Sequence, residues 1–169
     1  MLKARMNSPV MIAGDAMKAM QALAKASEQG GVPHATSLLV VLRASQINGC
    51  SVCVDMHSRE LKRIGERDER IFAVGAWRDA PFFTDAERAA LDLTEAVTRI
   101  ADRPDPVPDA VWNEAALHYD ERGLASLLLT ISSINVWNRL NVATRQVAGE
   151  WMKSPEVRSL VEKQATATA

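Results

Sequence analysis

Cys50, Cys53 and His57 lie within eight consecutive residues of this 169-residue chain. Two cysteines separated by two residues can close a disulfide without unfolding, so an oxidised sulfur on one can be resolved by the other. A histidine has an unperturbed pKa of about 6.5, so His57 can accept or pass on a thiol proton near neutral pH. The three residues therefore predict a redox-active dithiol with a base beside it.

Helical spacing brings these side chains to one face. Gly49 indicates a break between two helices, which puts Cys50 near an N-terminus, where free N–H groups and the helix dipole lower a thiol pKa. At about 100° per residue, Cys53 lies about one turn before His57, and Cys50 about two turns before it. The face continues through three apolar side chains, Met56, Leu61 and Ile64. We expect it to point inward, where desolvation raises a thiol pKa and makes a nearby base necessary.

The spacing favours Cys53 as the sulfur that attacks a peroxide, because Cys53 is closer to His57 and more buried. Cys50, nearer the helix end, would then resolve the sulfenic acid and meet the reductant. The sequence does not fix this order, since sites of the thioredoxin type use the first cysteine for attack. The cycle would need an external dithiol reductant, and we expect no bound cofactor.

Two other interpretations of the cysteines are open. Both could be buried side chains without chemistry, because free cysteine is among the most buried residue types. Zinc is the other alternative: Cys50, Cys53 and His57 supply three plausible ligands, but there is no second Cys or His pair, and His34 and His118 lie far away in sequence. We interpret His34 and His118 as capping or packing residues, and expect no metal site.

The composition excludes several classes of protein. Twenty basic and twenty-one acidic side chains give a net charge of -1, without the basic block that nucleic-acid binding requires. The longest uncharged run, residues 123–138, is shorter than the roughly 20 residues of a membrane span. The length fits a single domain over residues 1–169. We expect a cytoplasmic protein, where a close cysteine pair is more often catalytic, redox-sensing or metal-binding than a permanent disulfide.

Apolar residues recur at three-to-four spacing, which predicts an all-α fold. Thr84 and Glu87 form a capping box at the start of the clearest helix, which runs to about Ile100. The other helices are expected over 15–29, 34–47, 51–64, 67–78, 109–119, 122–147 and 155–164. The three prolines of the 102–108 segment predict a rigid turn between packed helices.

One short pattern occurs twice. Ser45-Gln-Ile-Asn-Gly-Cys50 is matched by Ser132-Ser-Ile-Asn-Val-Trp137, each towards the end of an apolar stretch. The repetition predicts two similar helical hairpins that face each other. The second copy has no thiols, because Trp137, Leu140 and Thr144 take the places of Cys50, Cys53 and His57.

The segment from Arg43 to His57 resembles the alkylhydroperoxidase D-like, or carboxymuconolactone decarboxylase, family. The similarity extends through Gly65-Glu66, Trp77-Arg78, 83–91, 94–96 and 134–141. It implies an all-helical fold, a multi-helix orthogonal bundle with an internal helical-hairpin repeat. It also implies homo-oligomers (dimers, trimers or hexamers) and, in the dithiol branch, peroxide reduction. There the cysteines matching Cys50 and Cys53 are the redox pair, and the histidine matching His57 belongs to a proton relay.

One relay residue is missing. The family places a glutamate twelve positions before the first cysteine, and this chain has Leu38 there. Glu87 and Glu95 are possible replacements; the alternative is that both are ordinary surface carboxylates. The decarboxylase branch performs acid–base chemistry on a lactone without a dithiol, so the cysteines argue against that activity.

The sequence thus predicts an enzyme: a peroxidase or disulfide oxidoreductase that takes a small hydroperoxide and a protein or small-thiol reductant. A non-enzymatic redox sensor or assembly protein of the same fold and a zinc-stabilised helical module are the alternatives. No sequence motif identifies the hydroperoxide or the reductant.

Overall fold

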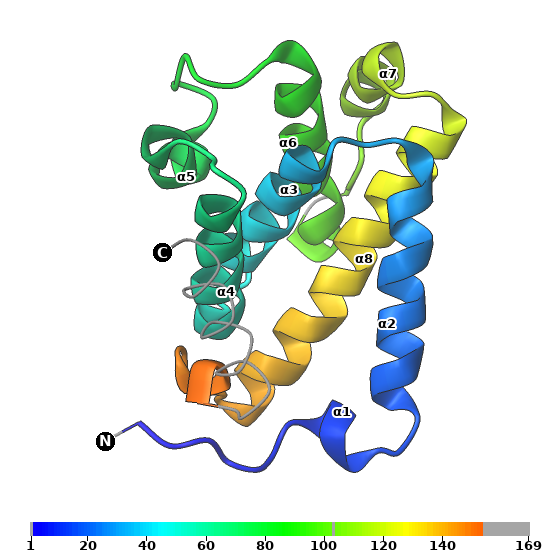
Figure 1. Cartoon of the computed structure of the whole chain (residues 1–169). Helices are drawn as coiled ribbons and strands as arrows, with labels where there is room; N and C mark the ends of the chain where they lie inside the picture. The colour runs from blue at the N-terminus through cyan, green and yellow to red at the C-terminus, as the bar shows by residue number, and fades with distance from the viewer. Residues whose placement is uncertain (1, 103, 154–169) are drawn as a thin grey trace.

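The chain folds into helices connected by short turns (Figure 1). The computed structural model describes residues 2–102 and 104–153, and in these residues there are eight α-helices, four 3-10 helices and no strand. The all-α prediction is confirmed.

The α-helices follow the predicted ranges closely. They are α1 (Pro9–Ile12), α2 (Ala16–Ser27), α3 (His34–Ile47), α4 (Ser51–Arg63), α5 (Asp68–Ala73), α6 (Asp85–Thr98), α7 (Asp109–His118) and α8 (Glu121–Thr144). The 3-10 helices are η1 (Glu28–Gly30), η2 (Val74–Ala76), η3 (Ile100–Asp102) and η4 (Glu150–Lys153).

Two predicted helices differ from the structure, and one short helix was not predicted. The helix expected over 67–78 is two shorter pieces, α5 and η2. The helix expected to reach residue 147 ends at Thr144, because Arg145 adopts a left-handed conformation with φ of 54°. The four residues of α1 are too few to show a periodicity and were not predicted. The helix expected over 155–164 lies outside the described residues.

α8 is the longest helix, and α2, α3 and α6 pack against it (Figure 1). α3 also packs against α4 and α6, while α7 packs against α6. α3 therefore has neighbours on several sides, and four of its residues from Leu39 to Ala44 are 0 or 1% exposed. This burial fixes the end of α3, where the cysteines begin.

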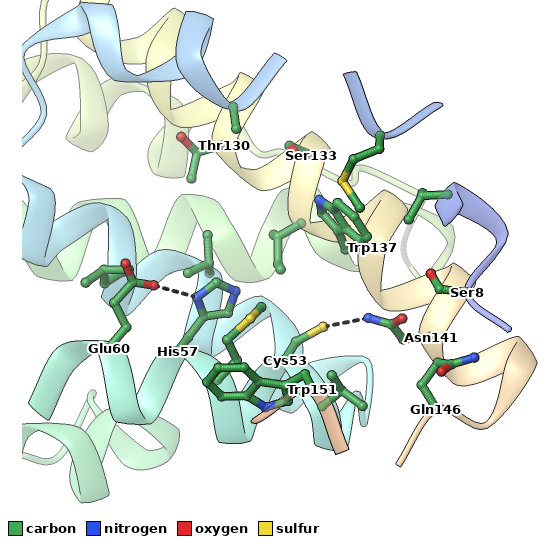
Figure 2. A pocket seen from close by; sticks show the side chains of 18 of the residues that line it. Ser8, Cys53, His57, Glu60, Thr130, Ser133, Trp137, Asn141, Gln146 and Trp151 are labelled. Atoms are coloured by element: carbon green, nitrogen blue, oxygen red, sulfur yellow. Dashed lines mark hydrogen bonds and ion pairs between the residues drawn. The ribbon is translucent and has the colours of Figure 1, made fainter. Parts of the chain in front are cut away.

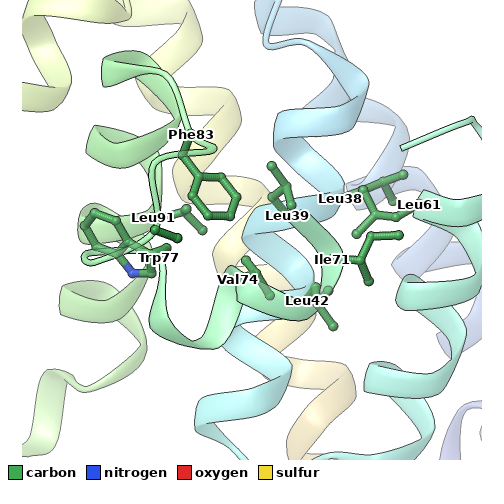
Figure 3. Close-up of a cluster of buried hydrophobic side chains, with 10 residues drawn as sticks. Leu38, Leu39, Leu42, Leu61, Ile71, Val74, Trp77, Phe83 and Leu91 are labelled. Carbon is green, nitrogen blue, oxygen red and sulfur yellow. The ribbon is translucent and has the colours of Figure 1, made fainter. Parts of the chain in front are cut away.

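Two apolar clusters hold these helices together. The first joins α3 and α4 to α5, η2 and α6 (Figure 3), and its members are Leu38, Leu39, Leu42, Leu61, Ile71, Val74, Trp77, Ala80, Phe83 and Leu91. The second joins α3, α6, α7 and α8 around Val40, Leu93 and Leu127. The predicted capping box starts α6: the Glu87 N–H donates to Thr84 Oγ1 at 3.3 Å, and the Thr84 N–H donates to Glu87 Oε2 at 2.9 Å.

Glu95 on α6 is a buried charge with four donors. Its side chain is 7% exposed and accepts contacts from Arg43 Nη2 at 2.6 Å, Trp77 Nε1 at 2.9 Å, Arg78 Nη1 at 2.9 Å and Arg99 Nη1 at 3.0 Å. Burial alone would raise the pKa of Glu95, but the hydrogen bonds from Trp77 and Arg43 and the nearby charges of Arg43 and Arg78 outweigh it and lower this pKa to about 2. Glu95 thereby ties α3 to α6.

We predict that Glu95→Gln destabilises the protein by about 3 kcal/mol at pH 7, because it leaves buried arginine charge without its carboxylate. A carboxyl whose folded pKa is lowered stabilises the fold above its unfolded pKa, and this contribution is lost as pH falls through the folded value. Urea unfolding should therefore show the difference between variant and wild type shrinking between the ordinary glutamate pKa of 4.5 and about 2. The exposed Glu121→Gln is the control, and equal losses in both variants would contradict this role.

Candidate active site

The turn between α3 and α4 places Cys50 at the start of α4. Gly49 has φ of 67°, a left-handed conformation that a glycine adopts without strain. Cys50 is the N-cap residue, and its Sγ accepts the backbone N–H of Cys53 at 3.4 Å. The predicted break at Gly49 and the predicted position of Cys50 at a helix N-terminus are both confirmed.

Side-chain amides hold this turn against α8. Asn48 Nδ2 donates to Asn135 Oδ1 at 3.0 Å and to Asn138 Oδ1 at 2.9 Å, and Asn138 Nδ2 donates to Ser45 Oγ at 3.1 Å. Asn48 and Asn135 hold matching places in the repeated sequence pattern, so the two copies do face each other. The second copy is not a hairpin, however, because α8 continues without a break through Val136, where the first copy has Gly49.

A cavity of about 1210 Å³ opens beside the dithiol (Figure 2). Its wall comes from α1, α2, α3, α4, α8 and η4, and includes Cys53 and His57. Cys50 is 1% exposed and is not part of this wall. The structure therefore brings Cys53 and His57 to one space and leaves Cys50 behind them, next to the turn. A reductant could not reach Cys50 in this conformation, although the sequence suggested that it would.

The expected inward-facing surface of α4 is present over most of its length. Leu61 is 0% exposed, and Met56 lines the cavity. Ile64 is the exception: it is 38% exposed, because α4 ends at Arg63 and the chain turns away.

The pKa values of the two thiols are shifted in opposite directions. The hydrogen bond from the Cys53 thiol lowers the pKa of Cys50 to about 6, against the opposing effect of burial. The same contact raises the pKa of the Cys53 thiol, and burial raises it further. The pair therefore loses one proton easily and holds the second between the two sulfurs. Moving that proton from Cys53 to Cys50 would put the negative charge on the sulfur that faces the cavity.

Asn141 on α8 supports such a charge. Its Nδ2 donates to Cys53 Sγ at 3.4 Å, and this amide lowers the pKa of both cysteines. Figure 2 shows the amide reaching from α8 to the sulfur. No local sequence signal predicts Asn141, because it lies 88 residues from Cys53.

The family's relay glutamate is absent from its usual position, but another carboxylate, Glu60, lies next to His57. His57 Nδ1 lies 3.6 Å from Glu60 Oε2, slightly beyond hydrogen-bond distance, and the His57 side chain is 14% exposed. Contact with His57 lowers the pKa of Glu60 in spite of burial. The spacing i,i+3 on a helix could have revealed this pair in the sequence. Among the described residues no hydrogen bond joins His57 to either sulfur, so a proton crossing between them needs a bridging molecule in the cavity.

Neither carboxylate that the sequence suggested as a relay partner serves His57. Glu87 completes the capping box and pairs with Arg70 at 2.5 Å, and Glu95 is the centre of the arginine cluster. Both are also buried, 9% and 6% exposed, so the alternative that they are surface carboxylates is wrong as well. At the place of the family's glutamate, Leu38 packs in the first apolar cluster and also lines the cavity.

The other histidines have different surroundings. His118 is the last residue of α7 and is exposed, with Nε2 3.3 Å from Glu114 Oε1. It forms a helical side-chain pair, and Tyr119 is the C-cap residue, so the expectation of a packing or capping residue is wrong. His34 begins α3, but it also lines the cavity, so it is closer to the site than its sequence position suggested. No three His, Cys, Asp or Glu side chains in residues 2–102 and 104–153 are placed to share a metal ion. The zinc alternative has no ligand set there.

None of the helices in the described part of the chain is long and apolar enough to cross a bilayer.

Comparison with known proteins places these residues in context. A model of the carboxymuconolactone decarboxylase family matches residues 14–96, which include both cysteines and His57. The uncharacterized protein YdfG of Bacillus subtilis (strain 168) is 38% identical over 132 residues, which cover 78% of this chain and 88% of YdfG.

Two solved structures resemble the fold. A protein of unknown function from Agrobacterium tumefaciens, suggested to be the antioxidant defence protein AhpD, has a TM-score of 0.80 and 35% identity, over 86% of this chain and 98% of that one. The debrominase Bmp8 has a TM-score of 0.73 over 90% of this chain and 78% of its own, but 20% identity, so it shows the shared fold alone.

We predict that thiolate absorbance at 240 nm shows one cysteine titrating near pH 6. Cys50→Ser should remove this step. Cys53→Ala should move it upward, because the thiol donor is lost, whereas Cys53→Ser keeps an O–H donor and should move it less. A wild-type titration with no thiolate forming below pH 8 would contradict the shared-proton arrangement.

Proposed function

Because the chain belongs to the carboxymuconolactone decarboxylase family, we propose that it is a thiol-dependent peroxidase of the dithiol branch that reduces organic hydroperoxides. The observation that carries the proposal is Cys53 in the wall of a large cavity, with Cys50 next to it and His57 one turn further along α4 in the same wall. The similarity to a suggested antioxidant defence protein supports it.

In the proposed first step the Cys53 thiolate attacks the hydroperoxide. The S–O bond forms as the O–O bond breaks, which leaves Cys53 as a sulfenic acid and releases an alkoxide. His57 donates the proton that converts this alkoxide to an alcohol. The amide of Asn141 stabilises the Cys53 thiolate before attack, because a hydrogen bond to a thiolate is stronger than a hydrogen bond to a neutral thiol.

In the second step the Cys50 thiol condenses with the sulfenic acid. A disulfide forms and water leaves, so the two thiols and the hydroperoxide become a disulfide, an alcohol and water. An external dithiol then returns both cysteines to thiols. We assign attack to Cys53 because it lines the cavity, although the lower thiol pKa belongs to Cys50.

The proposed setting is a homo-oligomer in the cytoplasm. The family resemblance supports the homo-oligomer, while the cytoplasmic location remains the expectation drawn from the sequence. The enclosed position of Cys50 means that the reductant has to reach the disulfide through Cys53 or after a local opening of α4.

We predict that the purified protein consumes cumene hydroperoxide repeatedly with dithiothreitol as reductant. Cys53→Ser should reduce the rate to that of the uncatalysed reaction, and His57→Asn should lower the rate by about 10²-fold or more. Cys50→Ser should form no intramolecular disulfide and should turn over only as fast as dithiothreitol reduces the Cys53 sulfenic acid directly. Ser51→Ala, an exposed position between the cysteines, is the matched control. Both thiols remaining titratable after a stoichiometric dose of hydroperoxide would rule out this mechanism, and one oxidation without turnover would favour the redox-sensor alternative.

Glu60 is proposed as a positioning residue that acts through His57. Glu60→Gln should lower kcat/KM by about tenfold, the equivalent of one charge-assisted contact. In the His57→Asn background the same change should have little further effect, because the two residues act as a unit. Glu114→Gln, which breaks a similar helical pair with His118, is the control. Additive losses in the double variant would contradict this role.

A further inference from the structure

The size of the cavity indicates an organic substrate. Ligand pockets in proteins commonly measure about 300–1,000 Å³, and a water molecule takes a share of about 30 Å³. The cavity beside Cys53 measures about 1210 Å³, far more than hydrogen peroxide needs. Much of its wall is hydrocarbon, thioether or indole, including Met11, Met17, Val41, Ile134, Trp137 and Trp151. The apolar part of a substrate would be buried here.

Apart from the histidines His34 and His57, the charged side chains of the wall all have one sign. Glu28, Glu60 and Glu150 line the cavity, and no lysine or arginine of the described residues does. A substrate carboxylate that enters this cavity loses its hydration and finds no lysine or arginine in the wall to compensate for the loss. Three carboxylates of the protein would also repel it.

The imidazoles do not supply the missing partner. His57 already faces Glu60 at 3.6 Å, and the charge of His34 also lowers the pKa of Glu60, after the larger effect of His57. The first turn of α3 meets the cavity at His34 and Ser37, but a helix N-terminus carries only about half a unit charge.

Two side chains outside the cavity wall, Arg63 and Lys153, form ion pairs with carboxylates of the wall. Arg63 Nη2 is 3.8 Å from Glu60 Oε1, and Lys153 Nζ is 2.6 Å from Glu150 Oε1. The Arg63 and Lys153 side chains are 56% and 64% exposed, and neither is part of the cavity wall, whereas Glu150, itself 56% exposed, is. Glu28 lies on the α2 side of the cavity, away from these two pairs.

We infer that this cavity selects its substrate by charge: it takes bulky apolar molecules that are uncharged or carry an amine, and it rejects those that carry a carboxylate. The inference rests on the proposed function for the reacting group, which makes the substrate an uncharged or amine-bearing organic hydroperoxide. The selection itself depends only on the wall. Acidic hydroperoxides, such as those of fatty acids, are then poor substrates.

The test uses three alcohols with the same apolar body and no peroxide bond. They are 2-phenylpropan-2-ol and its para-aminomethyl and para-carboxylate derivatives, titrated against the full chain by NMR at pH 8. The carboxylate should bind at least about tenfold more weakly than the neutral alcohol, and the amine at least as tightly. In the triple variant Glu28→Gln, Glu60→Gln, Glu150→Gln the gap should fall below about threefold. The triple variant Glu69→Gln, Glu114→Gln, Glu121→Gln, at exposed positions outside the cavity wall, controls for the same change in net charge.

If the triple variant does not fold, the double variant Glu28→Gln, Glu150→Gln replaces it and should narrow the gap partly. A carboxylate that binds as tightly as the neutral alcohol, a gap that the variants leave unchanged, or binding of none of the three alcohols would overturn the inference. Because no thiol chemistry is involved, this order of binding can hold in a protein without peroxidase turnover, and can fail in one that has it. The two proposals are therefore tested separately.

Discussion

The hydrogen bonds between the α3–α4 turn and α8 are the constraint on which the site depends. Asn48 contacts Asn135 and Asn138 across the two helices, and Asn138 is 0% exposed. Buried amides that lose a partner cost more than a single hydrogen bond contributes, so the turn has few alternatives. With the turn fixed, Cys50 caps α4 and Cys53 meets Asn141 and the cavity.

The same arrangement divides the chemistry between the thiols. Cys50 is the better anion because the Cys53 thiol and N–H both donate to it, while Cys53 has the access. One proton held between two sulfurs reconciles these facts, since its transfer changes which sulfur is charged without taking a proton from solvent. The Glu60–His57 pair lies on the cavity side, where an alkoxide would need a proton.

Much of this could be predicted from local sequence. Three-to-four periodicity predicted α3, α4 and α6, and Gly49 predicted the turn between α3 and α4. Both features depend on residues that are close together in the sequence. Asn141 and the buried pairing of Glu95 with Arg43 could not be predicted, since they join residues 88 and 52 positions apart. Glu60 was within reach of a helical-neighbour argument. The family's relay position suggested Glu87 and Glu95 instead, but Glu87 pairs with Arg70 and Glu95 pairs with Arg43.

In the proposed mechanism, a hydroperoxide oxidises the sulfur in the cavity wall, that of Cys53. The most direct measurement treats Cys50→Ser with one equivalent of cumene hydroperoxide in the presence of dimedone and locates the adduct by peptide mass spectrometry. We expect a sulfenic-acid adduct on Cys53, and a smaller yield when His57 is also replaced by asparagine. An unmodified Cys53 in this variant, together with an adduct on Cys50 in Cys53→Ser, would contradict it.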